Sequence, residues 1–277
     1  MSVVLIVRHG LTSSTGKALT GWLPGIELDD RGRAQASAVG ARLAGVPLAA
    51  IISSPLERCV QTASIIAAAH GESAAADAAA ADGQASACQA GRSHAGTGHL
   101  SANGQVAGRA GAEGGSIQVQ LDDRFGECRY GDWTGQPLRR LARDPLWRVV
   151  QAHPSAVRFP GPAGETMTAM QQRAIAAVRD WNARLGKDAV YVVCSHGDVI
   201  KAILADALGM HLDMLQRIQV DPCSLSIVRY TTLRPFVLRM NDTGADAAAL
   251  AALAHRPAAR SAAEADAQVG GGAGSGG

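Results

Sequence analysis

Two short polar motifs each follow a run of apolar residues. Arg8 and His9 come directly after the run 3–7, and His196 is the second residue after the run 189–194. Runs of this length that are rich in β-branched residues predict buried strands. Open α/β sheets bind their ligands at the carboxyl ends of their strands. We therefore expect an arginine and two histidines at the ligand-binding edge of one sheet.

These residue types suit a phosphate group. The planar guanidinium groups of Arg8 and Arg58 match phosphate oxygens, and Arg58 is expected in the first turn of a helix, where free N–H groups add to anion binding. The imidazole of His9 is a nucleophile when it is neutral, and nearby arginines favour that form. His196 can donate to the phosphoryl oxygens as charge builds up on them. The pattern predicts attack by His9 on a phosphate ester.

The glycines that follow the two histidines belong to the same expected pocket. Gly10 lets the chain turn without a Cβ in the way of the phosphate. Gly197 comes directly after His196, where a second helix is predicted to begin. We expect both glycines to lie against the phosphate.

A leaving alkoxide also needs a proton donor, and the stretch 122–133 offers acidic side chains. We take Glu127 as the candidate acid, because a nearby phosphate dianion would raise its pKa. Asp123, Asp132 and Glu165 are alternatives that more often serve as turn residues or helix starts. The sequence shows no carboxylate–histidine cluster with metal-ligand spacing, so we expect no metal and no other cofactor.

Strands that alternate with helices are expected to hold these motifs. This pattern predicts an α/β fold, a three-layer α/β/α sandwich with a largely parallel sheet. The expected strands are 3–7, 50–53, 189–194, 225–230 and 236–240, and the expected helices are 30–43, 56–69, 165–185 and 199–208.

Two segments differ in composition from the rest of the chain. Residues 72–118 are mostly Ala, Gly and Ser, and residues 243–277 are rich in Ala and end in GGGAGSGG. Neither can bury enough apolar surface to offset the entropy lost on ordering. We expect one catalytic domain over 1–242, with an inserted loop at 72–118 and a disordered tail from 243 onwards.

Charge and composition restrict the partners and the location. The net charge is +2 and no block of like charge occurs, so we expect neither nucleic acid nor a membrane surface as a partner. The five cysteines form an odd set without a CxxC motif, and the N-terminus has no signal-peptide pattern. We expect a soluble cytoplasmic protein with a small-molecule phosphate ester as its partner. The sequence leaves a homo-oligomer open.

Four motifs in order resemble the histidine phosphatase superfamily, also called the phosphoglycerate mutase-like family. They are LIVRHG at 5–10, SSPLERCVQTA at 53–63, GECRYGDWTG at 126–135 and CSHGDVIK at 194–201. The resemblance implies a phosphorylated His9, a phosphate pocket of Arg8, Arg58 and His196, and Glu127 as the proton donor. It also implies a metal-independent reaction.

The chain departs from the mutase branch of that family after the first histidine. Thr15 stands where an asparagine usually helps to hold the phosphate, and Thr12 matches a small hydroxyl residue often found there. These departures favour a broad-specificity phosphatase that hydrolyses a small phosphorylated metabolite through a phosphohistidine. A phosphoglycerate mutase-like phosphomutase is the first alternative, and a phospho-ligand binding module without turnover is the second.

Overall fold

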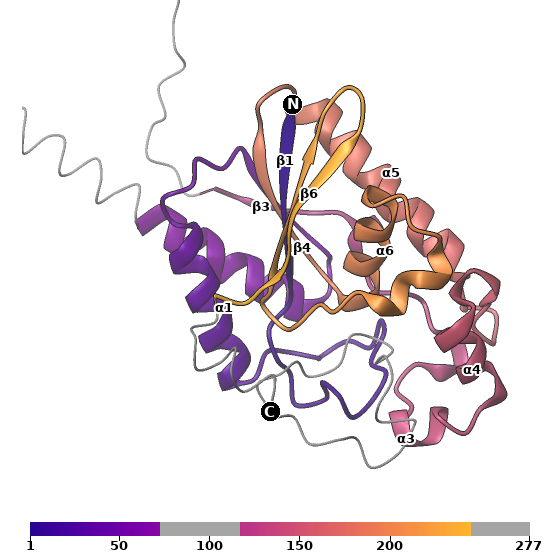
Figure 1. Ribbon diagram of the computed structural model, residues 1–277. Coiled ribbons are helices and arrows are strands. Elements are labelled where there is room, and N and C mark those ends of the chain that lie inside the picture. The colour runs from indigo at the N-terminus through magenta and orange to yellow at the C-terminus, as the bar shows by residue number, and fades with distance from the viewer. Residues whose placement is uncertain (73–116, 245–277) are drawn as a thin grey trace, which may run out of the picture.

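A mixed six-stranded sheet forms the centre of the computed structural model, which describes residues 1–72 and 117–244 (Figure 1). The strand order is β3-β2-β4-β1-β5-β6. The first four strands in this order are parallel to one another. At the other edge, β5 pairs antiparallel with β1, and β6 pairs antiparallel with β5. The strands are β1 (Ser2–Arg8), β2 (Ala50–Ser53), β3 (Val119–Leu121), β4 (Val190–Ser195), β5 (Leu225–Tyr230) and β6 (Pro235–Asp242).

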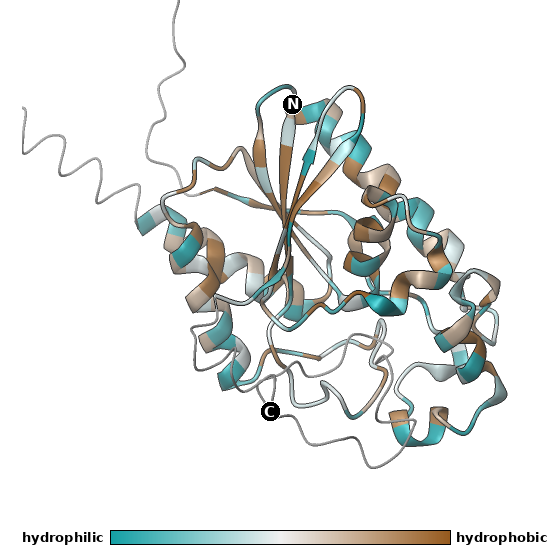
Figure 2. Ribbon diagram, in the orientation of Figure 1, coloured by the Kyte–Doolittle hydropathy of each residue, from teal (hydrophilic) through white to brown (hydrophobic). Residues whose placement is uncertain are grey.

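Helices cover both faces of the sheet. Successive side chains of a strand point to opposite faces, and β1 shows this clearly. Val4 and Ile6 pack in the core beneath α5 (Met167–Leu185) and α6 (Gly197–Ala207). Leu5 and Val7 pack on the other face, beneath α1 (Asp30–Leu43) and a helix over 57–72. Apolar colouring runs along the central strands in Figure 2. The helices include α1 (Asp30–Leu43), α3 (Leu138–Leu141), α4 (Pro145–Ala152), α5 (Met167–Leu185) and α6 (Gly197–Ala207), with 3-10 turns η1 (Asp123–Phe125), η2 (Gly131–Trp133), η3 (Pro154–Ala156) and η4 (Leu212–Arg217).

The predicted three-layer α/β fold is confirmed, and each predicted strand and helix appears within a few residues of its expected bounds. The strand β3 and the helices α3 and α4 were not predicted from the sequence. Residues 73–116 of the predicted insertion and 245–277 of the predicted tail lie outside the described residues. The division into a domain over 1–242 and a tail therefore stays a prediction. Within the described part, no helix is long and apolar enough to cross a membrane.

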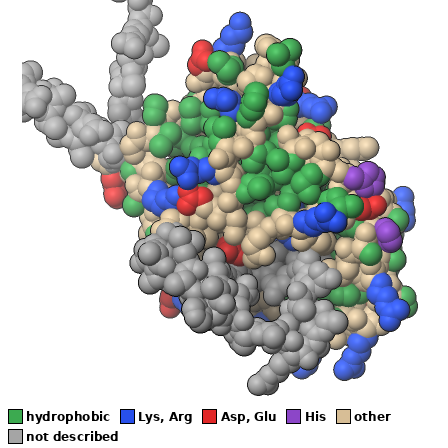
Figure 3. Space-filling view, viewed as in Figure 1, with side chains coloured by type: hydrophobic (Ala, Val, Ile, Leu, Met, Phe, Trp, Pro, Cys, Tyr) green, Lys and Arg blue, Asp and Glu red, His purple; other side chains and the backbone are tan. Residues whose placement is uncertain are grey.

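The outer strand β6 carries apolar side chains on its exposed face. Phe236, Leu238 and Met240 are each more than 40% exposed, and they alternate with Val237, which packs against the core. Figure 3 shows hydrophobic side chains gathered on this side of the molecule. The alternation explains why the sequence predicts a strand here although β6 lies at the edge of the sheet.

The loop after β1 is held by a close approach to the start of α1. A Cβ on Gly10 would lie 2.5 Å from the carbonyl oxygen of Gly32, and a Cβ on Gly32 would overlap the carbonyl oxygen of Leu11. That carbonyl also accepts the backbone N–H of Asp29, which caps α1, and the N–H of Leu11 donates to the side chain of Gln35. Only glycines allow this approach, which sets the path of the chain directly after His9.

We predict that Gly32→Ala destabilises the fold by about 1–3 kcal/mol, because the added methyl group has no space beside the loop. The measurement is the midpoint of denaturant unfolding. Gly45→Ala is the matched control, since a Cβ at Gly45 meets no atom within 4 Å. Equal stability of the two variants would contradict the close packing of α1 against this loop.

Candidate active site

The carboxyl ends of three neighbouring parallel strands bring the predicted site residues together. Arg8 at the end of β1 pairs with Ser195 of β4, and Ser53 of β2 pairs with Cys194. His9 and His196 therefore lie side by side, with their ring centroids 5.2 Å apart. The three motifs, which are far apart in the sequence, thus converge on one pocket.

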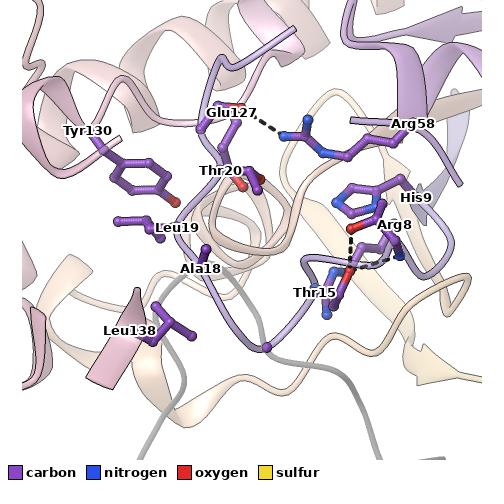
Figure 4. A pocket seen from close by; sticks show the side chains of 13 residues that line it. Arg8, His9, Thr15, Ala18, Leu19, Thr20, Arg58, Glu127, Tyr130 and Leu138 are labelled. Atoms are coloured by element: carbon purple, nitrogen blue, oxygen red, sulfur yellow. Dashed lines mark hydrogen bonds between the residues drawn. The ribbon is translucent and has the colours of Figure 1, made fainter. Parts of the chain in front are cut away.

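The pocket has a polar side and an apolar side (Figure 4). Arg8, His9, Thr15 and Arg58 lie together on one side, and Ala18, Leu19, Tyr130 and Leu138 lie on the other. The lining residues are Arg8, His9, Thr12, Thr15, Gly16, Ala18, Leu19, Thr20, Gly21, Arg58, Glu127, Tyr130 and Leu138.

The imidazole of His9 is fixed in the orientation that a nucleophile needs. Its Nδ1 lies 2.8 Å from the carbonyl oxygen of Gly10, an acceptor only, so Nδ1 carries the hydrogen and donates. The lone pair of the neutral ring is then on Nε2. Burial, and after it the charges of Arg58 and Arg8, lowers the pKa of His9 well below its usual range. His9 is therefore neutral near pH 7 and has the form that a nucleophilic histidine requires, and its predicted role as the nucleophile stays a prediction.

Arg58 comes from the first turn of the helix over 57–72 and is 1% exposed. Its Nη2 donates to the carbonyl oxygen of Gly21 at 2.9 Å and lies 3.3 Å from Nδ1 of His196. Its Nη1 is buried and has no hydrogen-bond partner among the described residues. Because buried donors in native proteins are normally paired, this atom marks a position for an anionic acceptor.

Arg8 is also buried, with 1% exposure. Its Nη1 donates to the carbonyl oxygen of Val220 at 2.8 Å, and its main chain bonds to Cys223 and Ser224. Burial lowers the pKa of Arg8 to about 10, so the guanidinium remains charged at neutral pH. The loop 220–224 thus holds a second cation beside His9.

His196 lies behind the pocket, since it does not line the cavity. Its Nε2 is 2.8 Å from the hydroxyl of Ser54, and its Nδ1 faces Nη2 of Arg58. A guanidinium only donates, so Nδ1 accepts and Nε2 carries the hydrogen of the neutral ring. Burial, and next the charge of Arg58, lowers the pKa of His196 well below its usual range. The described contacts thus place His196 as a support for Arg58, and its predicted donation to the phosphate stays a prediction.

Glu127 lines the pocket and is 4% exposed. Its Oε1 accepts the N–H of Cys128 at 2.9 Å, and its Oε2 lies 3.9 Å from Nδ1 of His196. Burial and the negative charge of Asp198 raise the pKa of Glu127 to about 7, against the opposing effect of Arg58. A carboxyl group with this pKa can both give and take a proton near neutral pH.

The three alternative acids do not reach the pocket. Asp123 and Asp132 are exposed and absent from its lining. The Glu165 carboxylate is engaged instead by the guanidinium of Arg173. Among the predicted candidates for the acid, Glu127 alone lines the pocket, and its role as the acid stays a prediction.

The two threonines after the first motif line the pocket and contact each other. The hydroxyl of Thr15 accepts the N–H of Thr12 at 3.0 Å, and the two hydroxyl oxygens are 2.9 Å apart. Gly10 and Gly197 do not line the cavity, so their predicted contact with phosphate stays a prediction. Within residues 1–72 and 117–244, no group of His, Cys, Asp and Glu side chains is arranged to hold a metal ion.

Sequence reasoning missed Thr20, Tyr130 and the apolar wall of Ala18, Leu19 and Leu138. Ala18 forms an isolated bridge with Pro137, which brings two loops together across the pocket. Neither loop has a periodic pattern, so no local signal could have revealed this pairing.

Comparisons with known proteins identify the family of this chain and its fold. The sequence profile of the histidine phosphatase superfamily (branch 1) matches residues 4–96 and 100–243. An uncharacterized Mycobacterium tuberculosis protein, Rv0525, is 46% identical over 67 residues, which are 24% of this chain and 33% of that protein. The aligned part thus spans less than two thirds of that relative.

Two solved structures share the fold. Phosphoserine phosphatase from Entamoeba histolytica is 20% identical with a TM-score of 0.64, and the alignment covers 87% of this chain and 98% of that one. A mycobacterial glucosyl-3-phosphoglycerate phosphatase is 20% identical with a TM-score of 0.63, at the same coverage of both chains.

We predict that kcat/KM for an alkyl phosphate falls as the pH rises through about 7. A general acid works only when it is protonated, and the pKa of Glu127 is about 7. Glu127→Gln should lower kcat/KM by about 10²–10⁴-fold and remove this dependence, leaving only the ionisation of the substrate. A variant that keeps the same decline above pH 7 would contradict the assignment of Glu127.

Proposed function

Because the chain belongs to branch 1 of the histidine phosphatase superfamily, we propose that it hydrolyses the phosphomonoester of a small metabolite through a phosphohistidine at His9. The observation that carries this proposal is the state of His9. Its Nδ1 is tied to the carbonyl of Gly10, its ring is kept neutral, and it shares the pocket with two buried arginines.

In the first step, Nε2 of His9 attacks the phosphorus atom and the bond from phosphorus to the ester oxygen breaks. The electron pair of that bond goes to the leaving oxygen, which takes the proton of Glu127. Arg8 and Arg58 face the phosphoryl oxygens and stabilise the charge that develops on them. The products of this step are an alcohol and a phosphohistidine.

In the second step, water attacks the phosphohistidine. The ionised carboxylate of Glu127 removes a proton from this water, and the bond between phosphorus and Nε2 breaks. Inorganic phosphate leaves, His9 is neutral again and Glu127 is protonated again. Both steps use one carboxyl group, which a pKa of about 7 allows.

The lining supports roles for the remaining predicted residues. Thr12 and Thr15 offer hydroxyl groups beside His9, and the apolar wall opposite suits the carbon skeleton of the leaving alcohol. The two fold neighbours are a phosphoserine phosphatase and a glucosyl-3-phosphoglycerate phosphatase. Phosphoserine and glucosyl-3-phosphoglycerate are therefore sensible members of a substrate panel.

We predict that the protein releases inorganic phosphate from such a panel in the presence of EDTA, because arginines neutralise the phosphate. The panel includes 3-phosphoglycerate and an aryl phosphate, and free phosphate is assayed beside isomerised product. Isomer with little free phosphate would contradict hydrolysis and show a phosphomutase. Binding of esters without any product would show a phospho-ligand binding module.

A further inference from the structure

One side chain outside the pocket holds the segment that carries Glu127. Arg173 lies on α5, and its side chain is 20% exposed. Its Nη1 donates to the carbonyl oxygens of Arg124 and Gly126 at 2.7 and 2.8 Å, and its Nη2 donates to that of Glu127 at 2.9 Å. A single guanidinium thus binds three carbonyls within four consecutive residues.

Glu165, just before α5, orients this guanidinium. Its two carboxylate oxygens accept Nη2 of Arg173 at 2.7 Å and Nε at 3.1 Å, a bidentate pair. Oε1 of Glu165 also accepts the backbone N–H of Arg129, and the backbone N–H of Glu165 donates to the carbonyl oxygen of Arg129. The Arg173–Glu165 pair therefore forms hydrogen bonds to the main chain on both sides of Glu127.

The held segment has little regular structure of its own. The 3-10 turn η1 (Asp123–Phe125) ends two residues before Glu127. Among the described residues, neither a strand nor a helix contains Glu127 itself. Backbone carbonyls in such a segment need partners from elsewhere. Among the described residues, two other side chains donate to carbonyls of this segment. Nε1 of Trp22 donates to the carbonyl of Glu127, and Oγ of Ser195 donates to that of Phe125.

The beginning of the segment has separate anchors. Asp122 accepts Nε1 of Trp181 at 2.9 Å, and Phe125 is fully buried in the core. The contacts of Arg173 add to these at the residues nearest to the carboxyl group that faces the pocket. Their effect falls on the position of Glu127 more than on the packing of the core.

We propose that Arg173, oriented by Glu165, is a positioning residue for proton transfer by Glu127. This inference rests on the proposed phosphatase function. Arg173 fixes the main chain of Glu127, so the carboxyl group stays where it can reach the leaving oxygen. Misplacement of a catalytic group by about 1 Å can cost about 10²-fold in rate.

The test compares two esters in wild type and in Arg173→Met. A p-nitrophenolate leaves without protonation, whereas an alkoxide requires the acid. We expect kcat/KM for an alkyl phosphate to fall about 10²-fold in R173M, while kcat/KM for p-nitrophenyl phosphate changes by less than about 5-fold. Arg173→Lys, which keeps the charge and part of the hydrogen bonding, should recover part of the alkyl phosphate activity. Arg179→Met, an exposed arginine on the same helix, is the matched control and should change neither ester.

A double-mutant cycle separates positioning from general damage. If Arg173 acts through Glu127, then R173M adds nothing to the loss of alkyl phosphate activity in E127Q. An equal loss for both esters, or losses that multiply in the double variant, would overturn the proposal. If R173M does not fold, Glu165→Gln is tested instead. It should lower kcat/KM for the alkyl phosphate more than kcat/KM for p-nitrophenyl phosphate, and an equal loss for both would overturn the proposal. Failure of the phosphatase proposal is distinguishable, because the wild type would then release phosphate from neither ester.

Discussion

Two arginine side chains are buried at the carboxyl edge of the sheet, and the chemistry of the site depends on the positive charge that they carry. Arg8 and Arg58 are each 1% exposed. Removing such a charge from water costs several kcal/mol, and backbone carbonyls of Val220 and Gly21 offset part of that cost. A phosphate dianion supplies the opposite charge. The fold thus creates a region of positive potential whose natural complement is a phosphate group.

Burial and different neighbouring charges shift the pKa values of His9 and Glu127 in opposite directions. The pKa of His9 is lowered by burial and by both arginines, so the proposed nucleophile is a neutral ring with its lone pair on Nε2. The pKa of Glu127 is raised to about 7 by burial and by Asp198, so about half of this carboxyl group is protonated at neutral pH. The proposed nucleophile and the proposed acid can therefore coexist at one pH, because their surroundings shift their pKa values in opposite directions.

The parts that could be predicted from the sequence are those encoded over a few residues. The apolar runs predict the strands, and Arg8, His9 and His196 follow these runs in the sequence. The parallel sheet then brings the motifs at the strand ends together. A Pro at the start of α4 after the Asp144 cap was a local signal that could have been read. β3 has three residues and carries too little pattern to be recognised.

Other features depend on contacts between distant segments. The apolar wall requires the bridge between Ala18 and Pro137, and the hold on Glu127 requires α5 to lie against η1. An arginine within a helix is ordinary in a sequence, so Arg173 gave no signal. The position of His196 behind the pocket likewise follows from its bonds to Ser54 and Arg58, which no local pattern encodes.

The most direct test of the account is to identify the phosphorylated residue. Glu127→Gln mixed with an aryl phosphate should form the phosphohistidine, because the aryl leaving group needs no acid, but hydrolyse it slowly without a base. The mixture is quenched in alkali, and the residue that carries the phosphoryl group is identified by peptide mass spectrometry. We expect the phosphoryl group on His9 in Glu127→Gln. We expect no phosphorylated residue in the double variant that carries both His9→Ala and Glu127→Gln. Phosphate on another residue, or turnover by His9→Ala alone, would contradict the account.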